Sequence, residues 1–261
     1  MSVAIEELPR RTHTSSEFQN LWTCQKLIRL WTDHPEWTAY ETIPILYRAL
    51  HMGEGQNPKS NGTLSMAQIV RSSDSRISGA PSTLLPDAQH AYLLVANYTD
   101  ELDRILRDKP KPMQKAIEDA AFAYYVFERI HPFPDGNGRV GRMIAKTVLK
   151  SAGLKDPTFH DQRWYGAKRS THLQAAEQVD ETSNLAHMEL FLAQSLTSVY
   201  DPLSSIDSPK SRELAGIIQI KHQASQQNVP GRLLRDIWPG FGDLPLYGNR
   251  PAYAKPKGGL K

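Results

Sequence analysis

Twelve consecutive residues bring together several side chains that can take part in chemistry. The segment reads His131-Pro-Phe-Pro-Asp135-Gly136-Asn137-Gly138-Arg139-Val-Gly-Arg142 and joins an imidazole, a carboxylate, a turn rich in small residues and two guanidinium groups. Gly136 and Gly138 can adopt positive φ angles and leave room for an anion close to the backbone. A helix beginning after this turn would point its unpaired N–H groups and the positive end of its dipole into the same space. The pattern predicts a binding site for phosphate oxygens.

The charged residues of this segment suit a polyphosphate substrate. Asp135 could hold Mg²⁺, which prefers one or two carboxylates together with phosphate oxygens, and Asn137 would add a neutral donor. Arg139 and Arg142 are three residues apart, so on a helix they share a face and reach different oxygens of a triphosphate. His131, with an ordinary pKa near 6.5, could take the proton of a hydroxyl that attacks a phosphorus atom. We therefore predict phosphoryl-centred group transfer.

Taken separately, the parts of this segment have ordinary explanations. A histidine before a proline-bounded turn is commonly structural, and Asp-Gly-Asn-Gly alone is a common turn. With Phe133, Arg139 and Arg142 in register, however, the residues resemble the signature of the Fic domain family, H-x-F-x-[DE]-G-N-G-R-x-x-R, at every specified position. The segment from Arg71 to Pro86 is also similar to the flap hairpin of that family. The resemblance covers roughly residues 40–200.

Fic domains typically transfer AMP from ATP to a Ser, Thr or Tyr hydroxyl of a target protein, and the resemblance implies a role for each matched residue. It implies His131 as the general base, Asp135 as the Mg²⁺ ligand, Gly136, Asn137 and Gly138 as the anion hole for the α- and β-phosphates, and Phe133 as the plug that fixes the loop in the core. Arg139 would hold the β- or γ-phosphate, and Arg142 the γ-phosphate. The substrates implied are ATP·Mg²⁺ and a protein with an accessible hydroxyl.

Two further groups of residues follow from the resemblance, and each also fits an ordinary reading. The flap residues Ser75, Arg76, Ile77 and Ser78 would hold the target segment as an added strand, or they form a plain surface turn. Trp164 and Tyr165 resemble the aromatic pair beside the nucleotide base, or they are core or rim aromatics. Further along the chain, His172 stands where the family often has Asn, which leaves the base undetermined.

Many Fic proteins are inhibited by a helix carrying [ST]-x-x-x-E-[GN], and no intact copy occurs here. Glu54-Gly55 has Leu50 at the position that requires Ser or Thr, and the Glu that follows Ser2 at the right spacing, Glu6, is followed by Glu7. Three explanations stay open: a separate antitoxin-like chain supplies the Glu, a degenerate version serves, or another route controls activity. The transferred group is also open, since UMP, phosphocholine or phosphate are alternatives to AMP, and so is a lapsed enzyme that only binds nucleotide and peptide.

The elements that must position these residues are predicted to be helices. Apolar periodicity predicts helices over residues 16–32, from 87 to the prolines at 110 and 112, and over 114–130, 138–153, 163–177 and 186–199, with a second segment near 43–50, a loop over 53–63 and a short helical pattern at 214–218. A short hairpin is expected over 69–86, and a loose tail over 239–261. We predict a mainly α fold: a single Fic-type helical bundle with a short β-hairpin flap. Its regions are an N-terminal helical extension (1–40), the core (41–200) and a C-terminal extension (201–261).

Composition sets limits on partners and compartment. The chain has 261 residues, of which 39% are apolar and 23% charged, so it can bury a sizeable core. A net charge of +3 from scattered charges suggests neither nucleic acid nor an acidic membrane as a partner. Cys24 is the only cysteine, which excludes an internal disulfide and predicts a lone buried thiol. Without a signal peptide or an apolar span, we expect a cytoplasmic protein, or an effector delivered without a cleavable signal. The oligomeric state is left open.

Overall fold

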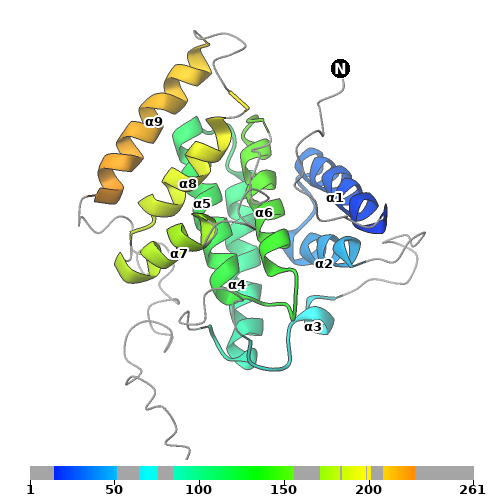
Figure 1. Ribbon diagram of the computed structural model, residues 1–261. Helices are drawn as coiled ribbons and strands as arrows, with labels where there is room; N and C mark the ends of the chain where they lie inside the picture. Colours follow the sequence, from blue (N-terminus) through cyan, green and yellow to red (C-terminus); the bar gives the residue numbers. More distant parts are fainter. Residues whose placement is uncertain are drawn as a thin grey trace, which may run out of the picture.

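A computed structural model describes residues 15–51, 65–75, 85–155, 171–182, 184–197, 199–200 and 208–226. Its elements are α1 (Ser15–Asp33), α2 (Ala39–Leu50), α3 (Met66–Ile69), α4 (Ala88–Arg107), α5 (Met113–Ile130), α6 (Asn137–Ser151), α7 (Thr171–Thr182), α8 (Ala186–Thr197) and α9 (Pro209–Gln226) (Figure 1). Within these ranges every regular element is a helix, which confirms the mainly α prediction.

Helix α5 forms the centre of the bundle. Every residue from 119 to 130 is buried, as expected of a helix that is apolar or small almost all round. Helices α4, α6 and α8 pack directly against it, α7 lies against α8, and α1 packs on α2 and α6. Figure 1 shows α1 and α2 on one side of α5 and α6, and α7, α8 and α9 on the other. Any charged side chain on this stretch of α5 must therefore find a partner inside the protein.

The described helices follow the predicted ones closely where the sequence has clear end signals. Asp87 begins α4, and its carboxylate accepts a hydrogen bond from the backbone N–H of His90 at 2.9 Å. Gly153, with a φ of 73°, follows the last turn of α6. Cys24 is fully buried, as predicted, and its pKa is raised to about 12 by burial. None of the helices in the described ranges is long and apolar enough to cross a membrane.

The structure differs from the prediction at the start of the expected hairpin. Residues 66–69 form α3, because Ser65 and Gln68 make a capping box, with the Ser65 N–H donating to the Gln68 side chain at 2.9 Å. Met66 and Ile69 of this turn are buried, so the first residue of the expected hairpin, Ile69, belongs to a helix. Residues 70–75 and 85–87 are not strands, and positions 76–84, where the rest of the flap was expected, lie outside the described residues.

Two helices near the C-terminal side also differ in length from the prediction. Helix α7 runs to Thr182, beyond the expected end at 177, and the expected start at 163 lies outside the described residues. Helix α9 has 18 residues, where only a short helical pattern was predicted. Its Lys221 is buried and pairs with Glu118 of α5 and Glu189 of α8, each at 2.7 Å. The expected loop at 53–63 and tail at 239–261 fall outside the described residues.

Candidate active site

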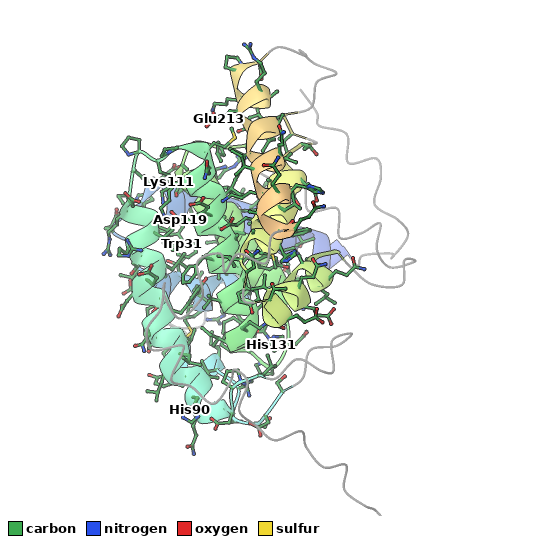
Figure 2. The ribbon with its side chains drawn as sticks, turned by 90° about the vertical axis from the view of Figure 1, so that its left-hand side faces the viewer. Trp31, His90, Lys111, Asp119, His131 and Glu213 are labelled. Atoms are coloured by element: carbon green, nitrogen blue, oxygen red, sulfur yellow. The ribbon has the colours of Figure 1, made fainter. Side chains whose placement is uncertain are left out.

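The candidate site lies at the junction between α5 and α6. Helix α5 ends at His131, whose backbone N–H donates to the Phe127 carbonyl at 3.0 Å and whose φ and ψ of 48° and 56° are left-handed. This backbone conformation is uncommon for a residue other than glycine. Strained conformations of this kind occur mainly at functional sites, where the surrounding structure holds them in place. In Figure 2, His131 lies at the opposite end of α5 from Lys111 and Asp119.

The environment of His131 favours the neutral imidazole. Its Nδ1 lies 3.3 Å from the carbonyl oxygen of Glu128. Because a carbonyl only accepts, Nδ1 carries the proton and Nε2 keeps its lone pair. Burial lowers the pKa of His131 to about 4, and the positive charges of Arg71 and Arg129 act in the same direction. The side chain is therefore in the form that a general base requires at neutral pH.

The loop between the two helices is anchored by Phe133 and Asn137. Phe133 is fully buried, and its ring lies 4.3 Å from that of Tyr47 and 5.7 Å from that of Phe127, measured between centroids. The buried Asn137 side chain accepts from the Phe133 N–H at 2.9 Å and donates to the Phe133 carbonyl at 2.8 Å. The sequence analysis expected Asn137 to add a donor for the ligand. The side-chain amide is instead used to fix the loop backbone at Phe133. The backbone N–H of Asn137 is then available to donate to a bound anion.

Gly136 is the residue where the loop meets α6, and its position favours glycine. Its φ is 79°, and a Cβ there would lie 2.8 Å from Cε1 of His51. The left-handed backbone would strain a residue with a side chain, and the new Cβ would require the His51 ring to move. Helix α6 starts at the next residue, and the first backbone N–H groups of a helix have no acceptor within that helix. The junction thus has the features of an anion site: an open turn, backbone donors and the positive end of a helix.

Charged groups surround this turn. Arg139 donates to the Asp135 carboxylate at 3.0 Å, and the Nε2 of His51 lies 3.6 Å from the same carboxylate and 3.4 Å from Arg139. Partial burial opposes ionisation of Asp135, but the Gly136 N–H, Arg139 and His51 together lower the pKa of this carboxyl below its ordinary value. The sequence analysis did not single out His51, because it follows α2, far from the motif, and carries no signal of its own.

The Asp135 side chain fits a magnesium ion shared with a nucleotide. It is 78% exposed, and within the described part of the chain no cluster of three or more His, Cys, Asp or Glu could form an all-protein metal cage. Mg²⁺ usually binds one or two carboxylates and completes its shell with water and phosphate oxygens. A single accessible carboxylate beside an anion site is consistent with that mode of binding.

Arg142 and the glycines of α6 lie where this helix closely approaches α5. A Cβ at Gly138 would be 3.4 Å from Nη1 of Arg142 and 3.5 Å from Oε1 of Glu128, and one at Gly141 would be 2.8 Å from the same Glu128 oxygen. Arg142 therefore lies in the second turn of α6, and its side chain lies beside Gly138. Arg139 is on the same helix, one turn earlier. The structure brings both predicted arginines to the same end of α6.

Arg71 is a second residue at the site to which the sequence analysis assigned no role. Its buried side chain reaches the backbone of the catalytic loop, where Nε donates to the His131 carbonyl at 2.8 Å. The predicted flap residue Ser75 is partly buried close by in the chain. Arg76, Ile77 and Ser78, and the aromatic pair Trp164 and Tyr165, lie outside the described residues, so their predicted contacts stay predictions.

A partly buried neutral histidine, a turn with the features of an anion site and two arginines on one helix would suit a protein that handles phosphorylated substrates. Comparison with known families agrees with this class of site. Residues 41–149 match the model of the Fic/DOC family.

Relatives with known names are similar over limited stretches. The chain is 41% identical over 49 residues to a probable protein adenylyltransferase of Aquifex aeolicus, covering 19% of this chain and 15% of that protein. It is 26% identical over 152 residues to the protein adenylyltransferase Fic of Drosophila melanogaster, covering 55% and 30%. A Fido domain-containing protein of Dictyostelium discoideum is 32% identical over 92 residues, 35% of this chain and 64% of its own. The two adenylyltransferases are thus matched over less than a third of their length.

A solved structure supports the fold over most of the chain. It is a Fic domain containing signaling protein from Bacteroides thetaiotaomicron, with a TM-score of 0.50 and 16% sequence identity, and the match covers 83% of this chain and 76% of that one. At this identity the likeness concerns the fold alone. It agrees with the predicted Fic-type helical bundle.

Proposed function

We propose that this protein is a protein adenylyltransferase that transfers AMP from ATP to a hydroxyl side chain of a target protein. The observation that carries the proposal is the junction of α5 and α6, where a neutral His131 stands beside a glycine turn and the N-terminus of a helix. The similarity of residues 41–149 to the Fic/DOC family supports it. So do the names of the relatives from Aquifex aeolicus and Drosophila melanogaster.

The chemistry follows from the residues at the junction. The target hydroxyl oxygen attacks the α-phosphorus, the bond from phosphorus to the bridging oxygen of the leaving group breaks, and pyrophosphate departs. His131 takes the hydroxyl proton on Nε2, because its Nδ1 is held by the Glu128 carbonyl. The backbone N–H groups of Gly136, Asn137 and Gly138 would face the charge that develops on the phosphate oxygens. For this, the Gly136 N–H would have to leave the Asp135 carboxylate, to which it donates in this structure.

The arginines and Asp135 complete the proposed binding of the nucleotide. Arg139 and Arg142 hold the β- and γ-phosphates with planar, paired donors. Asp135 would hold Mg²⁺, which neutralises phosphate charge when bound. The exposed Asp135 carboxylate and its contact with Arg139 support this placement. A cytoplasmic setting and control by a separate chain that supplies an inhibitory Glu belong to the same proposal and rest on the sequence.

The test is label transfer with wild-type protein and the His131→Ala variant. Each is incubated with Mg²⁺ and ATP labelled at the α-phosphate, with and without host lysate, and the products are resolved by gel and intact mass. A parallel set uses ATP labelled at the γ-phosphate. We expect α-label on protein with wild type alone, and a loss of at least about 100-fold in His131→Ala while ATP still binds.

Each alternative function gives a different result in this experiment. Label from the γ-phosphate would indicate phosphate transfer, and label only with another nucleotide or with a phosphocholine donor would change the transferred group. ATP binding without transfer under any condition would indicate a binding module. Equal labelling by His131→Ala would reject His131 as the base.

A further inference from the structure

Arg71 makes a set of hydrogen bonds that joins three separate chain segments. Its side chain is 2% exposed. Nε donates to the His131 carbonyl at 2.8 Å, Nη1 to the Ser73 carbonyl at 3.0 Å, and Nη2 to the Pro86 carbonyl. Its backbone N–H donates to the Pro132 carbonyl at 2.7 Å. All four acceptors are neutral backbone groups, so these bonds fix the direction of the chain at each of the three segments.

Two of these bonds act on the strained part of the catalytic loop. His131 is left-handed and is followed by proline, and the residue before a proline is normally extended. The Arg71 side chain donates to the His131 carbonyl and its backbone N–H to the Pro132 carbonyl, which belong to the two consecutive peptide groups on either side of Pro132. A conformation of this kind persists only where its surroundings define it, and Arg71 supplies two of the bonds that do so.

We propose that Arg71 is a positioning residue of the transfer reaction, one that fixes the His131 backbone and thereby the direction of its imidazole. The inference rests on the proposed function. Arg71 also connects the His131 backbone to the carbonyls of Ser73 and Pro86, which lie before and after positions 76–84. This geometry requires several N–H donors on one planar group, and among the side chains only the guanidinium of arginine provides them.

The charge of Arg71 supports the same assignment. Burial is the main cause of the lowered pKa of His131, and the nearby charges of Arg71 and Arg129 lower it further, while Asp135 opposes them. Removing the Arg71 charge is therefore expected to bring the pKa of His131 closer to its ordinary value. Lysine would keep the charge but could not reach three carbonyls at once.

The test compares Arg71→Lys and Arg71→Gln with two control variants. Arg104→Gln removes an arginine of α4 that is 65% exposed, and it controls for loss of charge. Lys221→Met removes a buried charge of α9 remote from the loop, and it controls for loss of stability. A small displacement of a reacting group costs about 100-fold in rate. We expect a fall of that size in kcat for both Arg71 variants, with an unchanged Kd for ATP.

The controls separate positioning from a merely structural role. Arg104→Gln and Lys221→Met should keep the wild-type kcat per folded molecule. If both Arg71 variants keep wild-type kcat, or lose no more than Lys221→Met does at equal stability, the proposal is overturned. It is equally overturned if Kd for ATP weakens in proportion to the loss of rate.

NMR of the His131 ring gives a readout that does not depend on transfer, with the signals assigned from the spectrum of His131→Ala. We expect the His131 signals to move in both Arg71 variants, and the pKa of His131 to rise only in Arg71→Gln. If the wild-type protein transfers no AMP, the proposed function fails and these signals decide the inference. In that case, His131 signals that move in the Arg71 variants would support the claim that Arg71 positions the His131 ring, whereas unchanged signals would reject it.

Discussion

Two buried arginines act on the pKa of His131, and they are held in opposite ways. On the loop side, Arg71 donates to backbone carbonyls, and burial lowers its pKa despite the carboxylates of Asp74 and Asp87. On the helix side, burial also opposes the charge of Arg129, but Tyr125 and Asp180 raise its pKa above the ordinary value. Its Nε and Nη2 lie 2.7 and 2.6 Å from the two Asp180 oxygens.

The difference indicates that the two arginines have separate roles, one in stability and one in the geometry of the site. Arg129 and Asp180 form a neutral pair that ties α5 to α7, so they contribute mainly to stability. Arg71 forms a longer ion pair, at 4.0 Å, with the exposed Asp74 and donates its hydrogen bonds to backbone carbonyls, including that of His131, so it contributes mainly to geometry and electrostatics. Changes on the helix side should therefore unfold the protein, and changes on the loop side should alter its chemistry.

The largest effect on stability is expected from Asp180→Asn. This change leaves the Arg129 charge buried, with an exposed fraction of 4% for its side chain, and breaking such a pair costs about 3 kcal/mol. Asp74→Asn is the matched control, because Asp74 is the carboxylate nearest to Arg71, at 4.0 Å, and is 82% exposed. We expect it to change stability by less than about 0.5 kcal/mol. Urea unfolding of both variants measures the contrast, and equal losses would contradict it.

A smaller loss is expected from Gly141→Ala, which probes the packing of α6 on α5 behind the site. The new Cβ would lie 2.8 Å from Glu128 Oε1 and 2.9 Å from Cδ2 of Tyr124, in a packed interior, and overpacking of this kind costs about 1–3 kcal/mol. Gly216→Ala in α9 is the control, since no atom lies within 4 Å of its Cβ position. There the helix propensity of alanine should stabilise by about 0.5–1 kcal/mol. Thermal unfolding should move in opposite directions for the two variants.

The last expected effect is the pH dependence of stability, which appears only below about pH 6.5. With a pKa of about 4 for His131 in the folded protein and an ordinary value near 6.5 in the unfolded chain, the unfolded chain binds the extra proton between these values. The His131 contribution is fully present above pH 6.5 and is lost as pH falls toward 4, by at most about 1.4 kcal/mol per pH unit. Unfolding of wild type and His131→Gln at several pH values tests this. Parallel curves for the two proteins would show that the pKa of His131 is not depressed.

Much of the fold could be predicted from the sequence because its signals are local. The Asp87 cap, the prolines after α4 and Gly153 after α6 mark helix ends, and the apolar run over residues 120–127 of α5 predicts that this helix is buried. The hairpin prediction was wrong at its first residue, because the bonds between Ser65 and Gln68 favour a helical turn that ends at Ile69. The described residues that follow, 70–75, and those at 85–87 are not strands.

At the site, the sequence determined the motif and the tertiary structure decided its surroundings. Residues 131–142 are contiguous, so the glycine turn, the start of α6 and the spacing of Arg139 and Arg142 follow from the chain itself. The contacts of His51, Arg71 and Asp180 join segments that are far apart in the sequence, and no local pattern predicts them. The depressed pKa of His131 likewise depends on burial and on two distant arginines, because desolvation and charge act through space rather than along the chain.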